Sequence, residues 1–389
     1  MVTLFDVARL AGVSTATVSR VVHGQDRVRE ATRIRVQQAI EELGYVPDGA
    51  ARSLSRRRKD IIGMVCVERQ AQQYDIENMN LLFYDEVLRG VESLIRDRDW
   101  SLLITFLRGA NDPDFPRLEM FSGKVDGIVI GEGIVPSPFL ERLATRVPVV
   151  VIAGTPDEWA ADVVTADNRS GSAAVVTHLI RDHGKRRLFW VDGPPNSPDS
   201  RERRRGLDQV LRVNPQCELV GWHQGYYSVQ SGEEAGQRLV ALPREDLPDA
   251  VVSANDQMAI GVLKALTRAG IAVPDEVALV GFDDIFPGSQ CDPPLTTVHQ
   301  PMRRLGERAC ARLLDRITNP RLSPTVELLP TELVLRSSCG CPPGTVTRQP
   351  VETLAVRAGP AAARTGSRGT RRGSHPAAAS GPARQAAKA

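Results

Sequence analysis

The residues best suited to recognition chemistry lie near the N-terminus, in the run from Ser14 to Arg20. Arg20 carries a planar fork of N–H donors, which can pair with guanine through two hydrogen bonds. Thr15 and Ala16 precede it, and small side chains of this kind allow a helix to lie deep in the major groove of DNA. A helical hairpin with a merely solvated polar face would show the same residue types, so the surrounding elements must decide.

Those elements have the pattern of a helix-turn-helix. Apolar residues recur at i, i+3, i+4 and i+7 within residues 4–11, and this spacing predicts a short amphipathic helix. Gly12 supplies the left-handed stop that helices favour, and Ser14 is a suitable N-cap for a second helix. A third helix with the same apolar spacing is predicted to end at Gly44. Two short helices joined by a glycine-containing turn favour DNA binding over the plain hairpin.

This N-terminal segment resembles the DNA-binding headpiece of the lactose-repressor (LacI) family over residues 3–54. The resemblance is specific because many residues match in a fixed register: Asp6-Val7-Ala8, Ala11-Gly12-Val13-Ser14, Thr17-Val18-Ser19-Arg20, Glu41-Glu42-Leu43-Gly44-Tyr45, Pro47 and Ala51-Arg52-Ser53-Leu54. It implies a headpiece at residues 1–47 and a hinge helix with its linker at residues 48–60. Arg29 departs from the family, which often has a serine there that could cap the third helix.

The resemblance implies that ten residues contact double-stranded DNA: Ser14, Thr15, Ala16, Thr17, Ser19, Arg20, Thr32, Ala51, Arg52 and Leu54. Thr15, Ala16 and Arg20 would read bases, whereas Ser14, Ser19 and Thr32 would contact phosphates. Leu54 would be a wedge between base pairs in the minor groove, in a hinge that folds only on the operator. Such a wedge is physically consistent, because unstacking costs about a few kcal/mol and bent DNA makes more contacts.

Behind the linker, strand-like and helical patterns alternate regularly from residue 61 to about residue 340. Continuous apolar runs such as residues 61–67 are typical of buried parallel strands. Helical apolar periodicity separates these runs, for example over residues 170–183 and 257–269. The alternation predicts parallel sheets with helices on both faces. The predicted fold is therefore an all-α helix-turn-helix headpiece followed by an α/β domain of two doubly wound subdomains.

The body also resembles the LacI family. The matching motifs are Asp167-Asn168 with Gly171 and His178-Leu179, residues 253–259 with Gly261, Gly270-Ile271, Val273-Pro274, residues 280–284, residues 295–298, Gln300-Pro301 and Gly306. The resemblance implies a type I periplasmic-binding-protein-like domain at residues 61–344, with two α/β subdomains, three crossovers and a ligand cleft. It also implies a homodimer that binds a palindromic operator and responds to a small sugar- or nucleoside-like effector.

Six residues of the body are candidates for effector binding: Asp199, Arg203, Tyr227, Asn255, Asp283 and Gln300. The resemblance assigns these roles, most weakly for Asp199 and Gln300. The physical pattern agrees in kind, because Asn255 and Asp283 follow apolar strands and open α/β sheets bind ligands at that edge. A polar ligand needs donors, carboxylate acceptors and an aromatic face.

Three alternatives stay open at these positions. Asp283 could cap the turn that follows it. Arg203 could belong to a solvated basic helix face, since arginines also stand at positions 201, 204 and 205. Tyr226 is adjacent to Tyr227, so either ring could be the stacking aromatic.

Charge is unevenly distributed along the 389 residues, although the net charge is only +2. Residues 1–60 hold 11 Lys and Arg against 7 Asp and Glu, and residues 345–389 hold 8 against 1. The body between them is therefore acidic. A basic end on an acidic body is typical of a protein that meets DNA with one end. Residues 345–389 are rich in Ala, Gly, Arg, Ser and Pro, so we expect a disordered basic tail.

Several function classes are not expected. No apolar run approaches the roughly 18 residues of a membrane span and no signal-peptide core is present, so we expect a cytoplasmic, nucleoid-associated protein without a membrane partner. The solute-binding protein of a transporter would share the body fold but needs a signal peptide and no headpiece. An enzyme fused to a DNA-binding domain would need a phosphate loop, a nicotinamide loop or a catalytic constellation, and the sequence has none. We therefore expect neither catalysis nor a cofactor.

The cysteines and histidines show no metal spacing along the chain. One close cysteine pair occurs, Cys339-Gly340-Cys341, and its single intervening residue is tighter than the usual zinc or thioredoxin motifs. No histidine is near this pair in sequence, and the six histidines are scattered. We therefore expect free thiols and no metal site.

Overall fold

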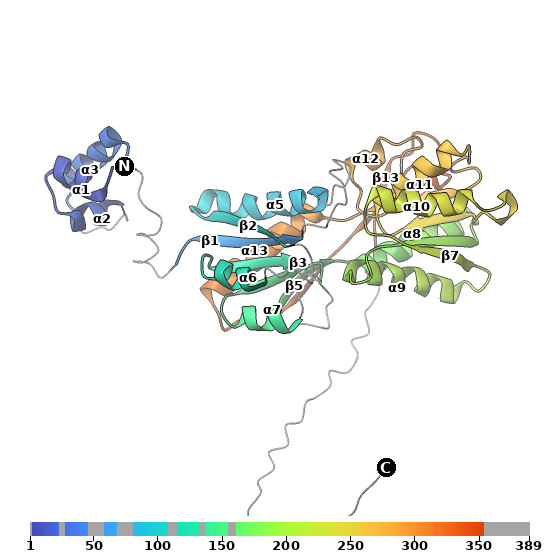
Figure 1. The fold of residues 1–389 in the computed structure, drawn as a ribbon, viewed down its shortest axis with the longest axis horizontal. Coiled ribbons are helices and arrows are strands. Elements are labelled where there is room, and N and C mark those ends of the chain that lie inside the picture. The colour runs from blue at the N-terminus through green and yellow to red at the C-terminus, as the bar shows by residue number, and fades with distance from the viewer. Residues whose placement is uncertain are drawn as a thin grey trace, which may run out of the picture. The chain divides into compact units, whose positions relative to one another are not determined.

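The computed structural model describes residues 2–22, 28–45, 58–67, 81–107, 115–131, 137–154 and 161–353 (Figure 1). The headpiece is made of α1 (Leu4–Ala11), α2 (Thr15–Val22) and α3 (Glu30–Leu43). Val7, Val18 and Val36, one from each helix, are fully buried where the three helices meet. The apolar stripes predicted from the sequence thus form the core of this small unit.

Local chemistry sets the ends of the headpiece helices. Thr3 begins α1 in a reciprocal capping box with Asp6, whose carboxylate accepts a hydrogen bond from the Thr3 N–H at 2.9 Å. Gly12 ends α1 in the left-handed conformation at φ 63°, and Gly44 ends α3 at φ 59°. Both stops match the sequence prediction. Arg29 precedes α3 without a side-chain cap, so the departure from the family pattern does leave this helix start uncapped.

The N-subdomain (residues 61–166 and 302–329) is built on a six-stranded parallel sheet in the order β11-β5-β4-β3-β1-β2. Its strands are β1 (Ile61–Val67), β2 (Ser101–Leu107), β3 (Gly127–Gly131), β4 (Val149–Ile152), β5 (Asp162–Ala166) and β11 (Val326–Leu329). Successive residues of a strand point to opposite faces, so each face of the sheet has its own core. The cores are covered by α5 (Leu81–Ile95) and α13 (Met302–Thr318) on one face and by α6 (Phe115–Ser122) and α7 (Ser137–Ala144) on the other.

Helices α5 and α13 cross at two glycines. A Cβ atom at Gly306 would lie 2.0 Å from the carbonyl oxygen of Val87, and one at Gly90 would lie 2.0 Å from that of Arg303. No side chain fits at either point, so glycine allows the two helix backbones to touch.

A buried carboxylate ties α13 to the sheet. Asp162, at the start of β5, accepts hydrogen bonds from Arg312 Nε at 2.7 Å, from Arg316 Nε and from the Thr325 N–H at 2.9 Å. Burial alone would raise the pKa of Asp162, but the hydrogen bonds from Arg316 and Arg312 outweigh it and hold the pKa below its ordinary value. This carboxylate therefore stays ionised and locks the C-terminal half of α13 in place.

The C-subdomain (residues 168–299 and 332–350) has a four-stranded parallel sheet in the order β7-β6-β8-β9 and a small antiparallel sheet in the order β10-β12-β13. The strands are β6 (Arg187–Asp192), β7 (Glu218–Gln224), β8 (Ala250–Ser253), β9 (Ala278–Val280), β10 (Thr297–His299), β12 (Glu332–Leu335) and β13 (Thr347–Pro350). Its helices are α8 (Asn168–Arg181), α9 (Pro198–Val213), α10 (Val229–Val240), α11 (Asp256–Arg268) and α12 (Phe286–Ser289). It also contains the 3-10 turns η2 (Arg244–Asp246) and η3 (Ser337–Cys339), whereas η1 (Arg96–Arg98) lies in the N-subdomain.

The chain passes between the two subdomains three times, as the resemblance implied. It crosses from β5 to α8, returns from β10 to α13, and crosses again from β11 to β12. Two parallel sheets flanked by helices, preceded by a helix-turn-helix, agree with the predicted fold class. No helix among these described segments is long and apolar enough to cross a bilayer.

One boundary needs correction. The predicted tail at residues 345–389 includes β13, which pairs with β12 from Glu332 to Leu335, so ordered chain continues past residue 344 to residue 353. The short β13 run is polar and exposed, and nothing in its composition marks it as a strand. The remainder of the predicted tail, residues 354–389, and the predicted hinge from residue 48 to residue 57 lie outside the described residues.

Candidate functional site

The residues predicted to contact DNA lie on or beside α2. Val18 and Val21 of this helix are buried against the rest of the headpiece, so the other side of the helix faces outward. That outward side carries five of the predicted side chains, exposed or partly exposed: Thr15, Ala16, Thr17, Ser19 and Arg20. The structure thus brings small side chains and one arginine together on the free face of a short helix.

Ser14 shapes the start of this helix. Its Oγ accepts a hydrogen bond from the Thr17 N–H at 3.2 Å and lies 3.0 Å from Thr17 Oγ1. Ser14 is therefore the N-cap of α2, as the sequence predicts. Thr32 lies in the first turn of α3 and is partly exposed. The last three candidates, Ala51, Arg52 and Leu54, lie outside the described residues.

Arg203, on α9, is the centre of a buried polar cluster in the C-subdomain. Its Nε donates to Asn168 Oδ1 at 2.8 Å, its Nη1 to the Ala254 carbonyl oxygen at 2.6 Å, and its Nη2 to Gln300 Oε1 at 2.9 Å. Only 3% of the residue is exposed. The alternative of a solvated basic helix face is therefore wrong for Arg203, whose fork joins three separate parts of the subdomain.

Two carboxylates stand beside this guanidinium. Asp283 Oδ1 lies 3.3 Å from Arg203 Nη2 without completing a hydrogen bond, and no other described side chain or backbone group bonds to that atom. Asp199 Oδ1 accepts a hydrogen bond from Asn168 Nδ2 at 2.8 Å. Asp283 does not cap the following turn, because Ile285 is the N-cap of α12. Asp283 is thus a buried acceptor with capacity for a further donor.

Burial dominates the electrostatics of both carboxylates. It raises the pKa of Asp283 to about 6, although the nearby Arg203 charge acts in the opposite direction. Burial likewise raises the pKa of Asp199 above its ordinary value, against the charge of Arg203 and the hydrogen bond from Asn168. A carboxyl group with a pKa of about 6 changes its charge close to neutral pH, and a perturbed carboxyl of this kind is typical of a functional site.

Asn255 lies at the end of β8 and begins α11 as its N-cap. Its Oδ1 accepts a hydrogen bond from the Met258 N–H at 3.0 Å, and its side chain acts to lower the pKa of Asp283, against the effect of burial. Asn255 therefore has a structural role as a helix cap in addition to its position in the cluster.

Two aromatic rings flank the guanidinium. The Arg203 Cζ atom lies 3.8 Å from the centroid of the Phe282 ring and 5.9 Å from that of Tyr227. The Tyr227 hydroxyl hydrogen-bonds with Ser197 Oγ at 2.9 Å, whereas Tyr226 is largely exposed. Of the two neighbouring tyrosines, it is Tyr227 whose ring belongs to the cluster.

Sequence reasoning missed Asn168, Phe282 and Asp256 as members of this cluster. All three stand within motifs that carry the family resemblance, Asp167-Asn168, residues 280–284 and residues 253–259, but the resemblance assigned none of them a ligand role. Asp256 is fully buried and accepts hydrogen bonds from Thr297 Oγ1 at 2.6 Å and from the Ile285 N–H at 3.0 Å. Burial raises the pKa of Asp256 well above its ordinary value.

The cluster lies at the carboxyl ends of β8 and β9, the edge where open α/β sheets bind ligands. It combines a forked cation, buried carboxylates, side-chain amides and two aromatic rings. Together these offer donors, acceptors and an apolar face within one site, which is the set needed to recognise a compact polar ligand.

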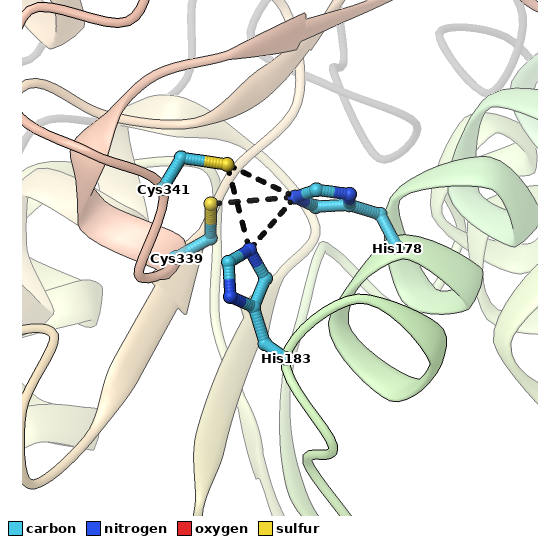
Figure 2. A group of neighbouring side chains, drawn as sticks. All are labelled: His178, His183, Cys339 and Cys341. Atoms are coloured by element: carbon cyan, nitrogen blue, oxygen red, sulfur yellow. Dashed lines mark hydrogen bonds between the residues drawn. The ribbon is translucent and has the colours of Figure 1, made fainter.

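No histidine is close to Cys339 and Cys341 in sequence, but the fold brings two of them beside the pair. His178 and His183, more than 150 positions earlier in the chain, lie beside both cysteines in space (Figure 2). One ligand atom from each of the four side chains lies within 4.8 Å of the others. The sequence separation concealed this cluster, because the crossover from β11 to β12 returns the chain to α8 only at the end of the domain.

Two family models match the chain. The model described as bacterial regulatory proteins, lacI family, matches residues 3–48, and the model described as periplasmic binding protein-like domain matches residues 176–339. The first covers the headpiece with α2, and the second covers most of the cluster around Arg203.

Similar full-length proteins are transcriptional repressors. The ribose operon repressor of Escherichia coli (strain K12) is 35% identical over 326 residues, which is 83% of this chain and 95% of the relative. The HTH-type transcriptional repressor PurR of Aliivibrio fischeri (strain ATCC 700601 / ES114) is 32% identical over 346 residues, which is 87% of this chain and 98% of the relative. Both likenesses extend from the headpiece through the body.

Solved structures agree. A lac repressor dimer bound to operator and the anti-inducer ONPF has a TM-score of 0.76 and 26% identity, over 87% of this chain and 99% of the other. The transcriptional regulator CelR in complex with cellobiose has a TM-score of 0.63 and 32% identity, over 87% of this chain and 100% of the other.

Proposed function

This chain belongs to the LacI family, and we propose that it binds a palindromic operator as a homodimer and releases or engages it in response to a small sugar. Its general function follows from membership: it is a ligand-responsive, DNA-binding transcriptional repressor with a helix-turn-helix headpiece. The observation that carries the finer proposal is the presence, in one chain, of the exposed α2 face and the buried Arg203 cluster.

On the DNA side, one headpiece reads one half-site. Arg20 is the exposed side chain of α2 that can pair with guanine through two hydrogen bonds, while Thr15 and Ala16 keep the helix surface small. A two-fold dimer presents two such helices, so its operator is an inverted repeat. This assembly is supported by the similar lac repressor, whose structure is a dimer bound to operator.

On the effector side, the Arg203 cluster is the proposed binding site. Its carboxylates and amides suit neighbouring hydroxyl groups, and the ring of Tyr227 suits the apolar face of a sugar, while the buried ring of Phe282 packs against the Arg203 guanidinium. The named ligands of relatives point the same way, because one similar regulator is a complex with cellobiose and one relative is named for the ribose operon. We therefore propose a mono- or disaccharide, or a close derivative, as the effector.

The link between the two functions runs through α13. Gln300 accepts a hydrogen bond from Arg203 and stands two residues before α13 begins. At the other end of α13, the Ile317 carbonyl oxygen accepts a hydrogen bond from Arg58 Nη2 at 3.5 Å. Arg58 belongs to the linker that follows the predicted hinge. A ligand that takes over hydrogen bonds of Arg203 or Gln300 would thus bias the position of α13. We propose that α13 in turn controls whether the hinge stretches around Leu54 come together in the operator-bound dimer.

Neither alternative function gains support. A solute-binding protein of a transporter has no use for a headpiece that matches the lacI family model. The relatives that cover most of this chain are repressors and not enzymes. We propose that the protein acts on the chromosome, in the cytoplasm.

The function is tested with the full-length chain in two steps. Selection from a pool of random double-stranded DNA should recover an inverted repeat, and fluorescence anisotropy on that repeat should then change with one member of a panel of pentoses, hexoses and disaccharides. A chain lacking residues 1–60 should lose the DNA but keep the thermal stabilisation by the same sugar. Recovery of no inverted repeat, with and without the sugar panel, contradicts the proposal.

A further inference from the structure

Four side chains with soft or borderline donor atoms converge between the C-terminal end of α8 and the segment that follows β12 (Figure 2). His178 lies in the last turn of α8 and His183 follows that helix. Cys339 is the last residue of η3, and Cys341 follows it after Gly340. His178 and Cys339 are buried, whereas His183 and Cys341 are partly exposed. The cluster lies apart from the residues that hold Arg203 and has no part in the proposed effector contacts.

The separations fit one small ion. His178 Nε2 and His183 Nε2 lie 3.1 Å apart, and Cys341 Sγ lies 3.5 Å from each of them. Cys339 Sγ lies 3.5 Å from His178 Nε2. A tetrahedral zinc ion with ordinary bond lengths separates two nitrogens by about 3.3 Å and a nitrogen from a sulfur by about 3.6 Å. Four of the six edges therefore match within a few tenths of an ångström before any adjustment.

The surroundings orient the donors. His178 presents Nε2 to the cluster, while its Nδ1 lies 2.7 Å from the Asp182 carboxylate, the carboxylate–histidine arrangement that fixes the ring of a metal ligand. Thr296 Oγ1 lies 3.1 Å from Cys339 Sγ. These contacts fix the directions of one nitrogen and one sulfur independently of any ion.

Gly340 allows the two cysteines to turn toward the same point. Its φ of 108° is in the range that side chains rarely adopt, and a Cβ there would lie 3.0 Å from His183 Nδ1. A Cys-Gly-Cys turn in this conformation can direct both thiols to one side of the chain, which a larger middle residue would prevent.

We propose that His178, His183, Cys339 and Cys341 form a structural zinc site. Two imidazoles and two thiolates in a closed tetrahedral set are the donors that zinc prefers in structural sites, and the set leaves no open position for catalysis. The ion would fasten the C-terminal end of α8 to the segment that follows β12. Because Asn168 at the other end of α8 contacts Arg203, the site stiffens the helix on which the effector cluster depends.

Metal content gives the first test. Full-length protein produced with zinc in the medium should contain one equivalent by elemental analysis. After chelation and replacement by Co²⁺, it should show the visible bands of tetrahedral cobalt together with a thiolate-to-cobalt charge-transfer band. Chelation should lower the melting temperature by about 5 °C or more, and zinc should restore it.

Single substitutions assign the ligands. Cys341→Ser and His183→Ala change the two partly exposed members and should each lose most of the bound metal. Cys291→Ser is the matched control, since its thiol lies outside the cluster and donates to the Pro287 carbonyl oxygen, as a hydroxyl can. Circular dichroism checks that each variant is folded. If a variant does not fold, cobalt titration of the unsubstituted chain still tests whether the site binds metal.

Two results would overturn the proposal. One is a chain that binds less than about a fifth of an equivalent of zinc or cobalt at micromolar concentration with all thiols reduced. The other is undiminished metal binding in both ligand variants. Neither result bears on operator binding, so this site and the proposed function fail independently.

Discussion

Arg203 Nη2 donates to Gln300 Oε1 at 2.9 Å, and both residues are almost completely buried. Arg203 stands on α9 of the C-subdomain, and Gln300 stands on the crossover that leads into α13 of the N-subdomain. This hydrogen bond therefore connects the proposed effector site to a helix that packs against the sheet of the N-subdomain and against α5.

Arg203→Lys should strongly weaken effector binding while leaving operator binding intact. A lysine cannot reproduce the fork that serves Asn168, Ala254 and Gln300 at once, and it leaves Asp283 with a weaker partner. We expect sugar affinity to fall by about 100-fold or more, as for loss of one partner from a buried charged network. Isothermal titration with the identified sugar measures this.

Arg204→Lys provides the control for that experiment. Arg204 is the next residue of the same helix and pairs with Asp208 at 2.8 Å near the surface. We expect less than about a twofold change in affinity, since exposed pairs contribute little. Equal losses in both variants would mean that Arg203 has no special role in the site.

Effector affinity should depend on the pH between about 5 and 7. Burial raises the pKa of Asp283 to about 6, so this carboxylate, which we propose accepts ligand hydroxyls, should be mostly ionised at pH 7 and mostly protonated at pH 5. Affinity should therefore fall by up to about tenfold as the pH drops across this interval. Asp283→Asn should bind the sugar more weakly at pH 7 and show a flatter profile. An unchanged slope in that variant would assign the titration to another group, with Asp199 as the nearest candidate.

Arg20→Ala should weaken specific operator binding by about 1–3 kcal/mol, the contribution of one bidentate base contact. Non-specific binding to a scrambled duplex should change much less, because this substitution does not alter the residues that we propose contact phosphates. Arg9→Ala is the control, since Arg9 is an exposed arginine of the same headpiece that pairs with Asp6 on α1. Equal losses for both variants on both duplexes would reduce Arg20 to a general charge contribution.

The parts that sequence reasoning predicted are those decided by local chemistry. Gly12 and Gly44 end their helices because glycine readily adopts the left-handed conformation that a helix end requires. The apolar stripe of residues 4–11 can be recognised because it repeats within two helical turns. The parallel sheets of the body could be predicted as well, because their buried strands are continuous apolar runs in the sequence. In each case the determining residues lie within about a dozen positions of one another.

The parts that were missed depend on long-range return of the chain. Asp162 looks like any acidic strand start until Arg312 and Arg316 meet it about 150 positions later. His178 and Cys339 are separated by 161 positions, so no linear spacing could join them. β13 is polar and exposed, and it is a strand only because β12 offers a free edge.

Asp162→Asn should destabilise the N-subdomain by about 3–5 kcal/mol at pH 7, because it leaves two arginines without their buried partner. The folded-state pKa of Asp162 lies below its ordinary value, so this stabilisation is present above about pH 4 and is lost as the pH falls through the folded pKa. Urea unfolding curves of the two proteins should therefore converge in acid. Asp85→Asn, in the exposed pair with Arg89, should cost less than about 1 kcal/mol.

Gly306→Ala should reduce the effect of the sugar on operator affinity. Its new Cβ would lie 2.0 Å from the Val87 carbonyl oxygen. Because that oxygen belongs to the backbone, a side-chain rotation cannot relieve the clash, and α13 must move away from α5. If α13 carries the signal from Gln300, this displacement fixes the helix in one position, and the ratio of operator affinities with and without sugar should approach one. Ala311→Gly is the control, because it destabilises the same helix by about 1 kcal/mol without altering the crossing. Loss of the response in both variants would tie the response to overall stability, and an unchanged response in Gly306→Ala would exclude the α5–α13 contact from the route.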